Sequence, residues 1–136
     1  MATIAAATMH KIDEYDAIVS VCELYMTGAA NGDRQKLKLA FHSDARTFGS
    51  AGGRRLDGPV DQFIEIACAD PVGRGGTYRG RVLEVNQVGD AASAVISEDG
   101  CWGSVSFIDY MSLARIDGTW KIVGKTFAHT GGEMPG

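Results

Sequence analysis

The hydrophobic residues change their spacing part-way along the chain, and this change limits the possible folds more than any other feature of the sequence. Before about residue 70, apolar side chains recur every three or four positions, as they do on one face of an amphipathic helix. From Thr77 onward they recur every second position, as they do in a strand. Helices followed by consecutive strands predict an α+β fold, with the helices packed on one face of a curved antiparallel sheet.

Three helices are expected in the first part of the chain. The first covers residues 9–30, and its apolar stripe consists of Ile12, Tyr15, Val19, Cys22, Met26 and Ala29. Asp33 is a good N-cap for a short second helix that ends at Phe41. A third helix has Asp57 as its expected cap and Pro59 near its first position. Its apolar face consists of Val60, Phe63, Ile64, Ala67 and Cys68.

The strands are expected between turn-forming residues. A short strand covers residues 45–48, and the glycine-rich segment after it, "GSAGGRR", is expected to be a loop. Gly-Asp and Asp-Gly pairs then separate longer runs with a spacing of two. These runs predict a four-stranded meander at residues 77–88, 91–99, 102–116 and 121–129.

Composition predicts one domain, covering residues 1–136 with its core at about residues 12–129, because 136 residues suit a single hydrophobic core. A net charge of −4 argues against nucleic acid as a partner. Three widely spaced cysteines predict no disulfide framework and no metal site, which favours a cytoplasmic location. No segment is long enough to cross a membrane. "GRGG" precedes a strand and does not open a helix, so no phosphate cradle or other cofactor site is expected.

His42, Ser43 and Asp44 are the residue types of a hydrolase triad, and they stand side by side in the sequence. Triad members come from separate elements and converge, which three consecutive residues in a turn cannot do. We therefore expect these residues to connect the second helix to the first strand and to take no part in catalysis.

Four features of the chain together resemble the nuclear transport factor 2-like superfamily, the cystatin-like cone. They are Tyr25 late in the first helix, "NGD", "FHSDA" and "DGTWKIV", and the resemblance extends from about Ile12 to His129. Within that superfamily the chain most resembles the putative lumazine-binding branch, a neighbour of the polyketide cyclase and ketosteroid isomerase branches. The resemblance implies a cone-shaped sheet packed against three N-terminal helices. It does not imply one reaction, because this superfold carries isomerases, dehydratases, cyclases and binding modules.

The ketosteroid isomerase branch places a general base in the strand after "FHSDA" and a second oxyanion donor in the penultimate strand. Counting from the shared motifs puts Gly49 at the first position and Ser112 at the second, so neither acidic residue is expected here. Only the tyrosine is retained, as Tyr25. Its hydroxyl is expected either to donate to a ligand carbonyl or to find a partner within the core.

Glu98 is the expected acidic group of the cavity. It follows Ala92, Ala94 and Ile96 at a spacing of two and would share their face. If that face lines the cone, Glu98 is a buried carboxylate with a raised pKa and can act as a general base. If the strand bends near Gly100, Glu98 is solvated. The other expected cavity residues, all assigned to ligand binding, are Tyr110, Ser112, Thr126, Phe63 and Trp102.

Three functions are compatible with this pattern. The first is a domain that binds a small apolar ligand in its cavity. The second is an isomerase, cyclase or lyase that acts on a carbonyl-bearing ring compound, with Glu98 as base and Tyr25 as oxyanion donor. The third is a protein-interaction module, which predicts a cavity filled by side chains.

The penultimate strand also predicts a partner. Its run "VSFIDYMSLARI" carries apolar residues on both faces, whereas the helices can cover only one of them. An apolar face that the helices leave exposed usually marks an interface, most often that of a two-fold dimer. We expect a homodimer through the outer sheet face, formed by Phe107, Met111, Leu113 and Phe127.

Overall fold

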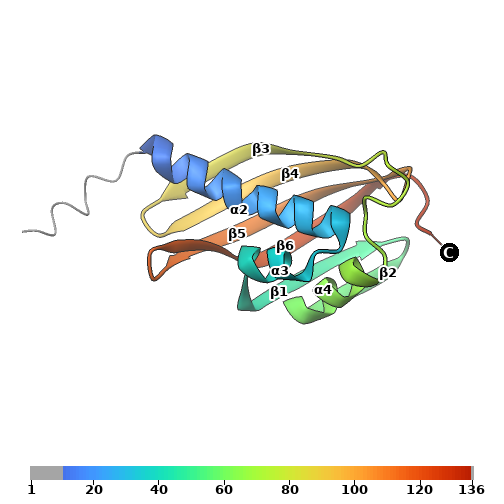
Figure 1. Cartoon of the computed structure of the whole chain (residues 1–136), viewed down its shortest axis with the longest axis horizontal. Helices are drawn as coiled ribbons and strands as arrows, with labels where there is room; N and C mark the ends of the chain where they lie inside the picture. The colour runs from blue at the N-terminus through green and yellow to red at the C-terminus, as the bar shows by residue number, and fades with distance from the viewer. Residues whose placement is uncertain (1–10, 136) are drawn as a thin grey trace, which may run out of the picture.

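The computed structural model describes residues 11–135, which form three helices and a curved six-stranded sheet (Figure 1). The helices are α2 (Lys11–Asn31), α3 (Arg34–Ala40) and α4 (Val60–Ala69). The strands are β1 (Phe41–Ala51), β2 (Arg54–Pro59), β3 (Arg79–Val88), β4 (Ala91–Cys101), β5 (Val105–Ile116) and β6 (Thr119–Gly131). The predicted α+β class, with helices on one face of a curved sheet, is confirmed.

The strand order is β2-β1-β6-β5-β4-β3. Strands β3 to β6 form the predicted meander, in which each strand runs antiparallel to the next. Strand β1 pairs in parallel with β6, and β2 folds back against β1. The β1–β2 pair joins the sheet beside β6, and α4 follows directly after β2. Helix α4 therefore lies on the same face of the sheet as α2 and covers one end of that face (Figure 1). Among residues 11–135, no helix is both long and apolar enough to cross a membrane.

Strand β2 replaces part of the predicted loop. Gly52 and Gly53 have φ values of 58° and 78°, so they form the tight turn that returns the chain onto β1. The extended backbone of β2 carries Asp57 away from the helix, and its carboxylate lies 3.5 Å from Arg46. The prediction that Asp57 caps α4 is therefore wrong, and Pro59 stands at the N-cap instead. By contrast, Asp33 caps α3 as predicted, since its carboxylate accepts a hydrogen bond from the Lys36 amide at 3.2 Å.

The buried face of α2 differs from the predicted stripe near its start, while residues 9 and 10 of the predicted helix lie outside the described residues. Ile12 and Tyr15 are 73% and 48% exposed, although the stripe included both. Glu14 is buried between them because its carboxylate accepts hydrogen bonds from Arg115 and from the Trp120 indole, the latter at 2.8 Å. A charged residue with two strong partners thus sets the orientation of the first helical turn.

The residue triplet His42, Ser43 and Asp44 opens β1, where the pairing with β6 shifts register. The Asp44 amide donates a hydrogen bond to Nδ1 of His42 at 3.0 Å. The triplet borders none of the cavities described below. Because α3 ends at Ala40 and β1 begins at Phe41, the triplet lies within the strand, and the prediction of a separate connector is wrong.

The two faces of β5 are reversed relative to the predicted dimer surface. Phe107, Met111 and Leu113 are buried beneath the helices, and Phe127 of β6 lines a cavity on that same side. They alternate with residues that face outward, because successive side chains of a strand point to opposite faces. The predicted surface residues therefore lie on the inner face.

The outer face offers other apolar residues for a homodimer, which stays a prediction. Phe48 of β1 and Tyr110 of β5 are 48% and 56% exposed there. If a second copy covers this face, light scattering gives twice the chain mass of 14.4 kDa, and the change Phe48→Glu shifts the protein to the monomer. The matched change Leu83→Glu, at an exposed position on the edge strand β3, should leave the mass unchanged. A monomer mass for the unmodified protein at micromolar concentration contradicts the prediction.

The pair Glu14–Arg115 predicts a difference in stability between two ion pairs. Arg115→Met removes the charged partner of the buried Glu14 carboxylate, which keeps its hydrogen bond from the Trp120 indole, whereas Arg34→Met breaks a surface pair with Glu65. We expect a clear fall in the urea midpoint for Arg115→Met and almost none for Arg34→Met. Equal midpoints for the two variants would show that the buried pair is not needed for folding.

Candidate functional site

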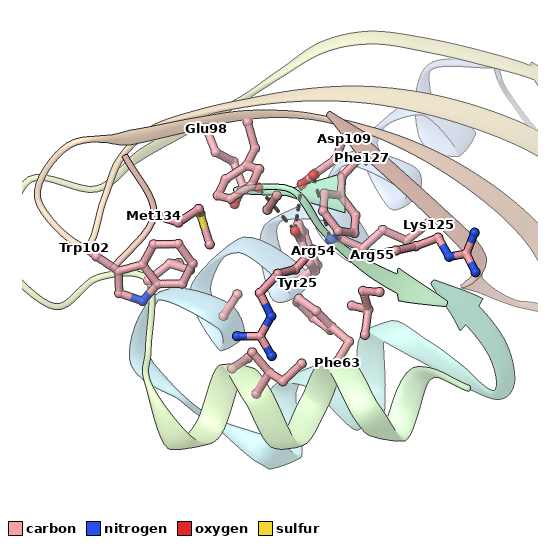
Figure 2. A pocket seen from close by; sticks show the side chains of 17 residues that line it. Tyr25, Arg54, Arg55, Phe63, Glu98, Trp102, Asp109, Lys125, Phe127 and Met134 are labelled. Carbon is pink, nitrogen blue, oxygen red and sulfur yellow. Dashed lines mark hydrogen bonds and ion pairs between the residues drawn. The ribbon is translucent and has the colours of Figure 1, made fainter. Parts of the chain in front are cut away.

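A cavity of about 410 Å³ lies between the sheet and helices α2 and α4 (Figure 2). Its walls are apolar and come from α4, from the loop after it and from the inner face of the sheet. The wall residues include Phe63, Ala67, Val72, Trp102, Phe107 and Phe127. Its floor is polar and is formed by Tyr25, Glu98, Asp109 and Lys125. Such a hollow, mostly apolar with a few convergent polar groups, is typical of a small-molecule site.

The hydroxyl of Tyr25 lies at the centre of the floor. It is 2.6 Å from Oδ2 of Asp109 and 3.2 Å from Oε1 of Glu98. A phenol has one hydrogen to donate, so the shorter contact marks Asp109 as its acceptor. Behind the floor, the Tyr78 hydroxyl donates to Oε2 of Glu98 at 2.6 Å. The two carboxyl groups are thus linked through Tyr25 and held in place by a second tyrosine.

Burial keeps a proton on Glu98. Its pKa is raised well above 4.5, first by loss of solvent, then by the negative charge of Asp109 and by a hydrogen bond with that residue. Tyr25 also stays protonated, because burial and then the charge of Asp109 raise its pKa well above 10.0. The floor therefore holds a protonated Glu98 close to the Asp109 carboxyl group, with the Tyr25 hydroxyl in contact with both.

Lys125 completes the floor from strand β6. Its Nζ atom lies 3.8 Å from Oδ1 of Asp109, which pairs their charges without a hydrogen bond. The same atom lies 4.2 Å and 4.4 Å from the ring centroids of Phe127 and Phe63. Aromatic faces attract a cation, so they hold the ammonium within the cavity wall while leaving its N–H groups free to reach a ligand.

Strand register explains why three charged residues meet on one face. Asp109 pairs directly with Ile96 of β4 and with Phe127 of β6. Glu98 and Lys125 each stand two positions along from these partners, so both lie diagonal to Asp109 on its own side of the sheet. The site is therefore spread over three neighbouring strands, with the aspartate in the middle.

The predicted placement of Tyr25, Glu98, Phe63 and Trp102 is confirmed, since all of them line this cavity. Their catalytic or binding roles stay predictions. The strand carrying Glu98 does not turn outward before Gly100, so the alternative in which Glu98 is solvated is wrong.

Tyr110, Ser112 and Thr126 do not share the cavity with Tyr25. They border a separate depression of about 350 Å³ on the outer face of the sheet. Their strand positions have the opposite parity to Asp109 and Lys125, so their side chains point away from the helices. The expectation that these three residues line the cone is wrong.

Asp109 is the functional candidate that sequence reasoning missed. Counting back from "DGTWKIV" led to Ser112, three positions too far along the strand, whereas the carboxylate that meets Tyr25 is Asp109. A signal was present, because Asp109 shares its parity with Phe107 and Met111, and an acidic residue among large apolar ones on a buried face needs a partner. Lys125 was missed in the same way.

Gly49 stands on the inner face of β1, where the related isomerases carry their base. A Cβ atom there would lie 2.6 Å from the ring of Phe127. The ring thus occupies the space that a side chain at position 49 would need. Any acidic group that acts in this cavity must come from β4 or β5.

Comparison with known proteins agrees with this fold. The profile of a family described as "Putative lumazine-binding" matches residues 13–128. A protein of unknown function from Shewanella baltica OS155, described as NTF2-like, is 27% identical, with a TM-score of 0.81 over 90% of this chain and 98% of that one. Another from Methylobacillus flagellatus is 28% identical, with a TM-score of 0.80 over 89% of this chain and 95% of that one.

Two further proteins are more distant and carry functional names. A ketosteroid isomerase-like protein from Erwinia carotovora has a TM-score of 0.65 over 84% of this chain and 94% of that one, at 17% identity, which shows the shared fold alone. A protein named aldolase FrzH, from Cladobotryum sp., is 22% identical over 114 residues, which are 84% of this chain and 90% of that protein.

The proton held by Glu98 predicts how stability varies with pH. The pKa of Glu98 is raised on folding above its value of 4.5, so between these two values the folded state binds the proton that the unfolded state has lost. Stability therefore falls as pH rises through this window. Glu98→Gln removes this titration, so the stability of the variant relative to the unmodified protein should increase as pH rises above 4.5. Urea unfolding at several pH values measures this, and a difference that does not vary with pH contradicts the prediction.

Proposed function

The chain belongs to the putative lumazine-binding family, and from the chemistry of its cavity we propose that it is an enzyme that transfers a proton on a carbonyl-bearing ring compound. The family and the fold support a domain that binds a small molecule. The proton-transfer step rests on one observation, which is the carboxyl pair Glu98 and Asp109 joined through Tyr25 on the floor of an otherwise apolar cavity.

Burying these groups is costly, and the fold does not require it. An unpaired buried carboxylate destabilises a protein by several kcal/mol, roughly, and apolar residues of similar size fill such positions at no such cost. At the other end of α2, Glu14 forms a compact ion pair with Arg115 and borders none of the cavities. The floor differs, because its polar groups border open space that is large enough for a ligand. Groups with strongly shifted pKa values in a cavity are typical of catalytic sites.

The roles follow from the protonation states. The ionised member of the carboxyl pair accepts the proton from the carbon next to the substrate carbonyl. The electrons of that C–H bond form the enolate, whose oxygen takes the negative charge. Lys125 supplies hydrogen-bond donors for that oxygen, and Tyr25 donates its one hydrogen to it after releasing the Asp109 carboxyl group. When the enolate is conjugated with a C=C bond, the carboxyl group returns the proton to the far carbon, which is an isomerisation. Alternatively, the α-carbon attacks a second carbonyl group, whose oxygen takes the proton, which is an aldol reaction.

The similarity to a protein named an aldolase supports this class of chemistry. Glu98 was expected to be the base alone, but its raised pKa favours sharing that role with Asp109. A domain that only binds its ligand is the second candidate, because the apolar walls alone would suffice for it. The protein-interaction module predicted a filled cavity, and the open volume does not support it.

The cell compartment stays a proposal as well. Cys22, Cys68 and Cys101 are all free thiols, which supports a reducing compartment such as the cytoplasm.

Exchange of α-protons tests the proposed step without knowledge of the product. Purified protein is incubated in D₂O with a panel of cyclic ketones and diketones, and loss of the α-proton signal is followed by NMR. We expect catalysed exchange for the unmodified protein. Asp109→Asn should reduce it about 100-fold or more, in the range of lost general acid–base catalysis, and Glu98→Gln and Tyr25→Phe should each weaken it.

Ser112→Ala is the matched control, because its side chain lies on the outer face. It should exchange protons at the unmodified rate, and circular dichroism should show all four variants folded. If ketones bind saturably but no exchange occurs, the protein is a binding domain and the proposed reaction is wrong.

A further inference from the structure

Arg54 extends from β2 across the opening of the cavity (Figure 2). It pairs with Ala51 of β1 and shares the inner face of the sheet. The next residue, Arg55, also borders the opening, but its guanidinium lies 5.8 Å from the ring centroid of Phe48, on the outer face. Two adjacent arginines therefore point to opposite faces of the sheet, and only Arg54 is directed at the cavity.

No carboxylate lies within ion-pair distance of Arg54 among residues 11–135. Four arginines, Arg34, Arg46, Arg74 and Arg115, each pair with an acidic residue. Of the arginines that form no such pair among the described residues, only Arg54 is directed at the cavity. An arginine that is left without a counter-ion at the opening of a cavity can supply its fork of donors to a ligand.

The turn that carries Arg54 is anchored. The Gly52 amide donates a hydrogen bond to Nδ1 of His129 at 3.2 Å. Met134 packs against the same glycine, since a Cβ atom added there would lie 2.9 Å from its side chain. The backbone next to Arg54 is thus positioned by His129 of β6 and by Met134, although Arg54 itself is exposed.

The interior does not repel an anion. Glu98 holds its proton, and the charge of Asp109 is matched by Lys125 at 3.8 Å. The floor is therefore close to neutral, and of the two arginines that border the opening, Arg54 is the one directed at the cavity. A ligand with an apolar body and one negative charge at its outer end matches this distribution of charge.

We infer that Arg54 binds a carboxylate on the substrate, so that the substrates are ring ketones that carry a carboxylate at the end opposite the reacting carbonyl. A guanidinium and a carboxylate form two parallel hydrogen bonds. A single cation also balances the single charge of a carboxylate better than the charge of a phosphate ester, which is near −2 at neutral pH. This inference rests on the proposed function for the ketone and on Arg54 for the carboxylate.

A carboxylic acid of β-tetralone and its methyl ester test the inference, because they differ only in the charged group. Binding is measured by calorimetry, or by the fluorescence of Trp102 in the cavity wall. We expect the unmodified protein to bind the acid about ten- to hundred-fold more tightly than the ester at low salt, in the range of a charge-assisted hydrogen-bond pair. Added salt should reduce this preference.

Arg54→Met should abolish the preference for the acid and leave binding of the ester unchanged. Arg55→Met is the matched control, since it removes the same charge one residue away but on the other face, and it should retain the preference. The inference is overturned if acid and ester bind equally, if neither binds, or if both arginine variants lose the same affinity.

The same compounds separate this inference from the proposed reaction. Exchange of α-protons in the methyl ester tests the reaction without the carboxylate. If the ester exchanges but Arg54→Met has no effect on the acid, the inference fails and the proposed function stands. If neither compound exchanges but Arg54 still selects the acid, the proposed function fails and the inference about Arg54 stands.

Discussion

The short hydrogen bond between the Tyr25 hydroxyl and the Asp109 carboxylate is the contact on which the site depends. It joins helix α2 to the middle of the sheet at a distance of 2.6 Å, between two residues that are almost fully buried. Beside this contact Glu98 retains its proton, because its burial and then the negative charge of Asp109 raise its pKa. The contact thus fixes the helix on the sheet and places the Asp109 carboxylate next to Glu98.

Helix α2 has two polar anchors with different consequences. Near its start, Glu14 accepts hydrogen bonds from Arg115 and Trp120, and these bonds hold this end of the helix against the sheet. Near its end, Tyr25 meets carboxyl groups that border open volume. A polar side chain thus points from α2 to the sheet at each end of the helix. Glu14 stabilises the packing of the helix, whereas Tyr25 forms part of the cavity floor.

The cavity is kept open by residues that are themselves constrained. Phe127 fills the space beside Gly49, and a side chain at that glycine would collide with the ring. Trp102, at the opposite wall, has a left-handed φ of 50° and is held by a hydrogen bond from its indole to the Asp70 carbonyl at 3.0 Å. These contacts leave the wall apolar and hold its shape, so that polar chemistry is confined to the floor and to the opening.

The sequence alone was enough for the order of the elements other than β2, for the helix cap at Asp33 and for the placement of Glu98, because each depends on local spacing or on a single turn. It could not decide which parity of β5 faces the helices, because that strand is apolar on both faces. Tyr110 and Ser112 were therefore assigned to the inner side of the sheet, and Asp109 was overlooked. The structure decided it through pairing across β4, β5 and β6, where register brings Glu98, Asp109 and Lys125 together. Such a meeting depends on contacts between residues far apart in the chain, and local patterns do not encode it.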